Sequence, residues 1–236
     1  AATNCLNSGN AEKPEVMWQF VRAVEGMGAA CRALDIPITG GNVSLYNETD
    51  GRAVLPTPVL GVVGLIDDAE RVARRVFLQS GDAVILLGES RAELGGSEYL
   101  YAIHGVTRGV PPALDLTQEA ALQRVLVDGI ASGLIRSAHD CAEGGLAVTL
   151  GECCFETGLG VRADVATVTA DSAAHADVAT LFGESASRAV VSVAPGDANA
   201  LIGLAGGGGL PARQIGIVGG IASRLRWTAA SLCSGV

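Results

Sequence analysis

Residues 14–39, PEVMWQFVRAVEGMGAACRALDIPIT, decide the fold expected for the first part of the chain. Pro14 suits the first turn of an α-helix, where a missing N–H leaves no hydrogen bond unmade. Apolar side chains then recur at steps of three and four, at Val16, Phe20, Val24, Met27, Cys31 and Leu34. This spacing predicts one apolar stripe on a helix of about six turns. A short buried strand is expected next, over 36–39.

The rest of the chain alternates irregularly between expected helices and strands. A polar loop from Gly40 to Pro58 and an apolar strand from Val59 to Ile66 complete a first block, which a charged stretch joins to a second. In the second block, strands are expected at Ala83–Leu87, Arg188–Val193, Gln214–Val218 and Arg224–Trp227. Helices are expected from a capping box at Asp115 and Gln118 to Ser132, and over Gly144–Glu156 and Asp197–Leu204. The irregular order favours an α+β fold over a doubly wound parallel sheet.

Composition limits the function classes. Hydrophobic residues make up 49% and charged residues 17% of 236, as in a globular protein with a substantial core. A net charge of -9 argues against a nucleic-acid partner, which would require clustered Lys and Arg. No signal peptide or apolar run of membrane length is visible, so no membrane partner is expected. Six cysteines without a Cys-x-x-Cys pair argue against structural zinc and favour reduced thiols in the cytosol.

Two polar segments of the first block are candidates for chemistry. The Thr3–Asn10 segment places amides and hydroxyls ahead of a helix N-terminus, which suits phosphate; the alternative is a simple cap and turn. In Gly40–Glu48, paired glycines allow a ligand to approach the backbone closely, Asn42 offers an oxygen to Mg²⁺, and Ser44 can donate a hydrogen bond. A glycine-initiated β-turn is the alternative there. No Gly-Lys-Ser/Thr follows, so this is not a P-loop.

Three polar segments of the second block lie between apolar elements: Leu94–Glu98, His139–Gly145 and Phe182–Arg188. Gly144 and Gly145, which open a helix, form a candidate anion nest. Asp140 and Glu143 are either metal ligands or carboxylates that favour the helix dipole. His139 is more typical of a structural histidine than of a base, and no G-x-S-x-G elbow marks a hydrolase.

These segments also carry a family resemblance over nearly the whole chain. Residues 4–18 (NCLNSGNAEKPEVMW), 41–48 (GNVSLYNE) and 61–66 (GVVGLI) resemble phosphoribosylformylglycinamidine synthase, of the aminoimidazole ribonucleotide synthetase superfamily. So do 94–99 (LGGSEY), 139–146 (HDCAEGGL) and 182–185 (FGES). The resemblance implies a partial second N-type domain at 1–76, a mixed sheet plus helix, and a second C-type domain at 77–236, an α/β sandwich with a mixed sheet.

The family resemblance also implies an activity. Members convert formylglycinamide ribonucleotide and glutamine-derived ammonia to formylglycinamidine ribonucleotide, using ATP and Mg²⁺, in cytoplasmic purine biosynthesis. The implied partners are a glutaminase subunit or domain, a small bridging subunit, and the missing N-terminal half of the synthetase. The start at Ala1 without Met is also expected of an excised or processed piece.

Site residues follow from the same resemblance, position by position. Asn4 and Gly41 match ATP contacts, Asn42 matches a Mg²⁺ ligand, and Ser44 matches a substrate contact. The family's catalytic histidine has no counterpart here, so no catalytic residue is expected in this part, and His104, His139 and His175 do not take that role. Two positions depart from the family: Ser8 replaces the usual Phe and Ala11 a common Pro, which puts local packing at the ATP loop in doubt.

Other functions remain open at this stage. The chain alone could be an inactive scaffold or a dimerisation module, because a truncated N-type sheet has an exposed edge and apolar strands that invite a homodimer. Another ATP-using superfamily member, such as a selenophosphate synthetase or thiamine-phosphate kinase relative, is a further alternative. The run Asn42–Asn47 argues against that reading.

Overall fold

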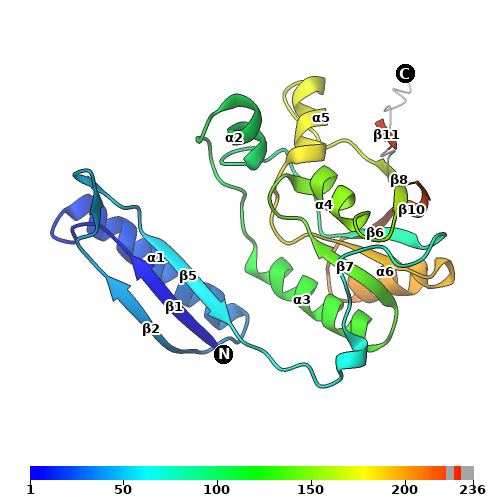
Figure 1. Ribbon diagram of the computed structural model, residues 1–236, viewed down its shortest axis with the longest axis horizontal. Helices are drawn as coiled ribbons and strands as arrows, with labels where there is room; N and C mark the ends of the chain where they lie inside the picture. Colours follow the sequence, from blue (N-terminus) through cyan, green and yellow to red (C-terminus); the bar gives the residue numbers. More distant parts are fainter. Residues whose placement is uncertain (222–225, 230–236) are drawn as a thin grey trace. The chain divides into compact units, whose positions relative to one another are not determined.

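The chain forms two compact units, Ala1–Asp67 and Asp68–Val236. The computed structural model describes residues 1–221 and 226–229 (Figure 1). Both units combine helices with β-sheet, and the larger sheet is mixed, which confirms the expected α+β fold. The stretch after Asp68 is tied to the second unit, where Arg74 forms a β-bridge with Ser137. The domain boundary expected after residue 76 stays a prediction.

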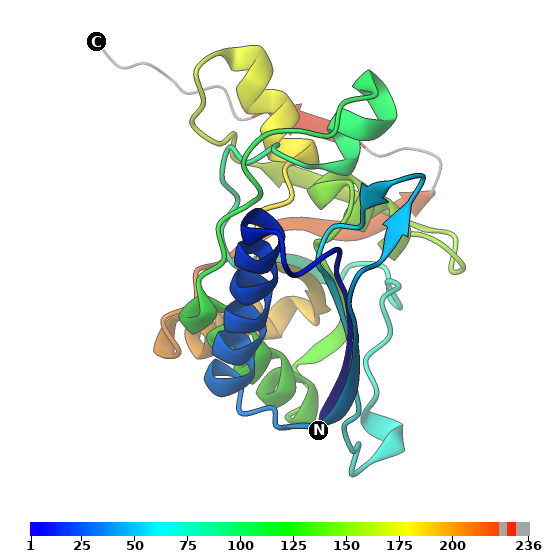
Figure 2. The same cartoon turned by 90° about the vertical axis from the view of Figure 1, so that its left-hand side faces the viewer.

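The first unit is a three-stranded sheet with one helix against it. The sheet has the order β2-β1-β5, and β1 pairs in parallel with β2 and antiparallel with β5. Its elements are β1 (Ala2–Asn7), α1 (Pro14–Ala33), β2 (Ile38–Ser44) and β5 (Thr57–Val62), with a small hairpin of β3 (Glu48–Thr49) and β4 (Arg52–Ala53). Figure 2 shows α1 along one face of this sheet. The unit's buried apolar side chains are Ala2, Leu6 and Val16.

The helix expected from residue 14 is confirmed, but two expectations around it are wrong. Residues 40–44 are not loop but the second half of β2, because parallel pairing with β1 bonds their backbone despite the two glycines. Of the segment Thr3–Asn10, the part up to Asn7 is strand rather than cap, and its inward positions Ala2 and Leu6 are too few to give a clear sequence signal. The turn is present at Asn10, whose Oδ1 accepts from the N–H of Glu12 at 2.8 Å. The strand expected at Val59–Ile66 occupies Thr57–Val62 instead.

The second unit is a six-stranded sheet between two helical layers. The strand order is β11-β8-β10-β6-β9-β7, and among these pairs only β8 and β11 run parallel. The strands are β6 (Ala83–Leu87), β7 (Ile135–Asp140), β8 (Leu159–Val165), β9 (Ala189–Val193), β10 (Ala212–Ile221) and β11 (Arg226–Ala229). The helices are α2 (Glu98–His104), α3 (Leu116–Ala131), α4 (Gly145–Cys153), α5 (Ala173–Phe182) and α6 (Ala198–Gly207), with short 3₁₀ turns at Ala69–Arg71 and Pro195–Asp197.

Strand β6 lies at the centre of the core, and all five of its residues are buried. Val84 and Leu86 pack in one cluster with Leu146 and Leu150 of α4. The alternate residues Ala83, Ile85 and Leu87 pack in a second cluster with α3 and α6. Figure 1 shows the two helical layers on opposite sides of this sheet. Because both faces are covered, the strand is apolar throughout rather than alternating.

Several elements of the second unit match their sequence signals in part. Asp115 caps α3, since its Oδ1 accepts from the N–H groups of Thr117 and Gln118. The return half of the capping box is absent, because the Gln118 amide donates to the Gly209 carbonyl at 3.3 Å. Strands β7 and β8 and helices α2 and α5 were not anticipated. Residues 224–225 of the strand expected at Arg224–Trp227 lie outside the described residues, and the next two belong to β11.

Candidate functional site

Strand pairing brings the two candidate segments of the first unit side by side. In the parallel ladder of β1 and β2, Asn4 is opposite Gly41 and Asn7 is opposite Ser44. Asn42 lies opposite Cys5. The chain reaches this arrangement through a β1-α1-β2 crossover, the standard connection between parallel neighbours. The four residues implied by the family resemblance therefore lie in one short stretch of sheet.

The same ladder divides those four residues between the two faces of the sheet. Successive side chains of a strand point to opposite faces, and partners in a ladder share a face. Asn4 and Gly41 share the face of the buried Leu6, which packs toward α1. Asn42 and Ser44 share the opposite face with Cys5 and Asn7, their partners on β1.

Gly41 is the most constrained glycine of the segment. A side chain at this position would collide with both the amide oxygen and the backbone carbonyl of Asn4, whereas a side chain at Gly40 would meet nothing. The Asn4 amide thus lies directly over the Gly41 backbone. Because β2 is an edge strand, part of its backbone has no neighbouring strand and is open to a ligand.

A polar turn after β2 closes this end of the sheet. The Asn47 amide donates to the carbonyls of Ser8 at 3.0 Å and Ser44 at 2.8 Å, and the Ser44 hydroxyl donates to Asn47 Oδ1 at 3.3 Å. Tyr46 has a positive φ of 63° and donates its N–H to the Gly9 carbonyl at 3.0 Å. Asn47 is therefore the residue that fixes the position of Ser44, a role that its place in the sequence alone did not reveal.

Ser8 is fully buried beside this turn, and its hydroxyl has no hydrogen-bond partner among the described residues. Its backbone is well satisfied, since its N–H donates to Ser44 and its carbonyl accepts from Asn47. A buried hydroxyl without a partner is unfavourable relative to an apolar group. The departure at Ser8 thus occurs at a site suited to an apolar side chain.

In the second unit, the three polar segments expected to be separate loop tips meet at Glu184. Its Oε1 accepts from the N–H of Gly144 at 2.8 Å and from the N–H of Glu98 at 2.8 Å. These two groups open α4 and α2. The anion nest expected at Gly144 and Gly145 is therefore filled by a carboxylate of the chain itself, rather than left open for a ligand.

Arg188 anchors the third of these segments from inside. Its side chain is buried and donates to the carbonyls of Ser185 at 2.8 Å and Gly183 at 2.7 Å, and to the Ser90 hydroxyl at 2.8 Å. Burial lowers the pKa of the guanidinium, and the nearby charge of Glu93 opposes this shift. Arg188 is a positioning residue that holds the loop after β6 against the loop before β9.

His139 is a structural histidine in this arrangement. It lies on β7, and its Nε2 and Nδ1 are 2.8 Å from Glu152 and 3.0 Å from Asp140, respectively. With both nitrogens engaged, the ring has none free to act as a base. Among the residues that the structure describes, no three His, Cys, Asp or Glu side chains are grouped to hold a metal ion.

Family comparisons cover both units. The model of the AIR synthase related protein N-terminal domain matches residues 1–66, and the model of its C-terminal domain matches residues 79–225. The subunit PurL of phosphoribosylformylglycinamidine synthase from Anaeromyxobacter sp. (strain Fw109-5) is 55% identical over 154 residues, which are 65% of this chain and 20% of that protein. The subunit from Moorella thermoacetica is 57% identical over 152 residues, 64% of this chain and 21% of that protein. The chain spans about a fifth of the length of these relatives.

Solved structures share the fold at low sequence identity. Phosphoribosylformylglycinamidine synthase II from Thermotoga maritima is 16% identical with a TM-score of 0.70, over 97% of this chain and 35% of that one. T. maritima PurL complexed with FGAR gives a TM-score of 0.71 at 16% identity, over 97% of this chain and 37% of that one. A hydrogenase maturation protein, HypE, gives a TM-score of 0.61 at 19% identity, over 97% of this chain and 73% of that one. The family models and the relatives confirm the resemblance found in the sequence, and the solved structures show a shared fold.

Proposed function

Because the chain belongs to the family of AIR synthase related proteins, we propose that it is part of an ATP-dependent ligase of purine biosynthesis. The reaction is the conversion of formylglycinamide ribonucleotide and glutamine-derived ammonia to formylglycinamidine ribonucleotide. Relatives with 55% identity that carry the name of this synthase support the proposal. The observation that carries it is the β1–β2 pairing, in which Asn4, Gly41, Asn42 and Ser44, the proposed ligand contacts, all lie in one short stretch of sheet.

In the proposed reaction the substrate amide oxygen attacks the γ-phosphorus of ATP, and ADP leaves. Ammonia then displaces the phosphate from the activated carbon and loses protons as the amidine forms. Proteins accelerate phosphoryl transfer mainly by positioning groups and neutralising charge. Mg²⁺ would supply charge neutralisation on the phosphates. The exposed amide oxygen of Asn42 fits such a hard ion, but it is a single ligand and the others must come from elsewhere in the enzyme.

The two faces of the sheet then have different tasks. Ser44 gives its hydrogen to Asn47, so its lone pairs can accept from an N–H of the substrate on the open face, next to Asn42. Asn4 lies on the face that α1 covers, so we propose that it supports the Gly41 backbone, and that this backbone contacts ATP at the free edge of β2, one residue from Asn42. The remaining partners that we propose are the N-terminal half of the synthetase, a glutaminase subunit or domain and a small bridging subunit, all in the cytoplasm.

Reconstitution tests the proposal. The chain is combined with the rest of the synthetase, and ATP-dependent formation of formylglycinamidine ribonucleotide is measured. We expect turnover, which Asn42→Ala lowers by about tenfold or more because a metal contact is lost. Gly26→Ala, at an exposed position of α1, serves as the control, since a side chain there meets no other group. Stable co-assembly without turnover would refute the proposal.

A structural role as a dimerisation module is the second candidate, and one observation favours it. The first unit leaves many apolar side chains exposed. Among them are Trp18, Val59 and Val63, whose exposed fractions are 64%, 62% and 73%. Exposure on this scale is typical of a surface that a partner covers. Light scattering at micromolar concentration should then give the mass of a homodimer, and a monomer would exclude this role.

A further inference from the structure

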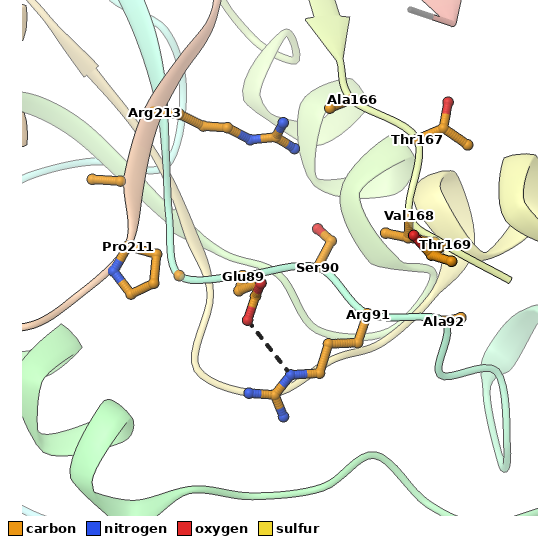
Figure 3. A pocket seen from close by; sticks show the side chains of 12 residues that line it. Glu89, Ser90, Arg91, Ala92, Ala166, Thr167, Val168, Thr169, Pro211 and Arg213 are labelled. Atoms are coloured by element: carbon orange, nitrogen blue, oxygen red, sulfur yellow. Dashed lines mark ion pairs between the residues drawn. The ribbon is translucent and has the colours of Figure 1, made fainter. Parts of the chain in front are cut away.

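The second unit contains a cavity of about 550 Å³ that none of the residues discussed for ATP or substrate lines. It lies where β6 and β8 end and β10 begins, between residues 88–92, 166–169 and 211–213 (Figure 3). Pockets for small molecules in proteins fall in the range of about 300–1,000 Å³. The cavity is therefore large enough for a metabolite rather than a bare ion.

Arg213 is a charged residue of this cavity that has no ion-pair partner among the described residues. It stands at the start of β10, opposite Leu86 of β6, and its guanidinium extends into the cavity in Figure 3. The side chain is half-buried, and burial lowers its pKa. No acidic side chain or hydrogen-bond acceptor contacts it within the described part of the chain. A partly desolvated cation without a counter-charge is unfavourable, and a bound anion would remove that cost.

The other charges of the cavity leave Arg213 without compensation. Glu89 and Arg91 both line it, and their charged groups lie 3.9 Å apart, so the carboxylate is already engaged by a second arginine. The formal charge of the lining is thus one positive unit from Arg91, Arg213 and Glu89 together. This local positive charge stands out in a chain whose net charge is -9.

Ser90 supplies a directed donor to the same space. Its Oγ accepts a hydrogen bond from the buried Arg188 at 2.8 Å, which occupies a lone pair and leaves the hydroxyl hydrogen free to donate. Figure 3 shows the Ser90 hydroxyl on the side that faces Arg213. Thr167 follows the end of β8 and also lines the cavity, but its side chain points away from Arg213 and Ser90 in Figure 3. The donors that face the cavity therefore come from two separate segments, at Ser90 and Arg213.

We propose that this cavity binds the phosphate group of a small metabolite, with Arg213 and the Ser90 hydroxyl as its principal contacts. The several N–H groups of Arg213 and the Ser90 hydroxyl come from different segments, and a phosphate, with three terminal oxygens, can accept from both. Arginine and hydroxyl donors are common phosphate contacts. The site is separate from Asn4, Gly41, Asn42 and Ser44, so it does not depend on the function proposed above.

Binding to the full chain, without turnover, tests this proposal. Inorganic phosphate, ribose 5-phosphate and ADP are titrated by calorimetry against the unaltered chain, Arg213→Met and Ser90→Ala. Arg124→Met is the control, because it removes an equal charge from an exposed position on α3 in the same unit. We expect Arg213→Met to raise the Kd by about tenfold or more and Ser90→Ala by less, with Arg124→Met within about twofold of the unaltered chain.

The probes distinguish the sources of the phosphate. Tightest binding of ribose 5-phosphate identifies a phosphomonoester, and tightest binding of ADP identifies a nucleotide; either result supports the site if it depends on Arg213. Arg213→Met removes a partly desolvated charge, so its melting temperature should not fall, and weaker binding cannot then be ascribed to unfolding. The proposal is overturned if no probe binds at about 10 mM, or if Arg213→Met binds as tightly as the unaltered chain.

Discussion

Gly41 shows how strongly one neighbour can constrain a residue while the adjacent position stays free. The Asn4 amide lies over the Gly41 backbone, but the space around Gly40 is open. Both glycines are in β2, so backbone propensity affects them alike, but only at Gly41 would a side chain meet a neighbour, Asn4. Two alanine substitutions in adjacent positions therefore distinguish the effect of the Asn4 contact from the effect of an added side chain on the strand itself.

Gly41→Ala should weaken the β1–β2 pairing, whereas Gly40→Ala should not. The new methyl group must displace Asn4, and overpacking of this kind costs about 1–3 kcal/mol. Hydrogen exchange of the β1 and β2 amides measures the effect directly, with faster exchange expected for Gly41→Ala. Equal exchange in the two variants would show that Asn4 moves aside without cost.

Thiol reactivity provides a second prediction for single residues. Burial raises the pKa of the Cys141, Cys153 and Cys154 thiols, so less thiolate is present at pH 8 and the sulfur is shielded as well. Cys5 is exposed. We expect Cys5 to react with N-ethylmaleimide about 100-fold faster than these three in the native protein, as read by peptide mass spectrometry. In urea the four rates should converge; labelling of Cys153 at the native rate of Cys5 would contradict the packing described here.

At the scale of elements, one carboxylate joins the starts of two helices. Glu184 binds the N–H groups that open α4 and α2, and Arg188 holds the same loop against Ser90. Unpaired N–H groups and a positive dipole end make a helix start a suitable partner for a carboxylate. The loops of this unit are thus tied by a few long-range polar contacts rather than by apolar packing alone.

Glu184→Ala should lower the free energy of unfolding by about 1–3 kcal/mol, because two backbone donors lose their acceptor. Glu184→Gln keeps an oxygen in the same position and should lose clearly less. Urea unfolding of the full chain measures both, and Glu143→Ala, an exposed carboxylate nearby, is the control. A loss in Glu184→Ala no larger than in Glu143→Ala would show that water replaces the carboxylate at little cost.

Elements with strong local patterns could be predicted from the sequence, and those that depend on distant partners could not. Helix α1 and strand β6 are confirmed because a stripe and a wholly apolar run are visible in neighbouring residues. Strand β7 was missed because it is an edge strand with Ser137, His139 and Asp140 among its six residues. The division of Asn4 and Asn42 between two faces, and the meeting of three loops at Glu184, follow from pairing across long sequence separations, which no local pattern encodes.

At the scale of the whole molecule, the two units differ in how much core each has. The second unit covers both faces of a six-stranded sheet with two apolar clusters. The first unit has 67 residues and buries only Ala2, Leu6 and Val16 of its apolar side chains, while those of α1 and β5 remain largely exposed. Units below about 70–80 residues rarely obtain sufficient stability from a single core, even a well-packed one.

Residues 68–236 should therefore fold alone, whereas residues 1–67 should not. The larger piece is expected to give one cooperative urea transition by circular dichroism, with the same midpoint as the main transition of the full chain, because both of its apolar clusters consist of its own residues. The smaller piece should show neither a transition nor protection from proteolysis until a partner covers its sheet. Cooperative unfolding of isolated 1–67 at concentrations where it is monomeric would show that its exposed apolar residues do not require a partner. The dimerisation role would then lose its physical basis, whereas the ligase proposal, which depends on Asn42 and its neighbours, would still be decided by reconstitution.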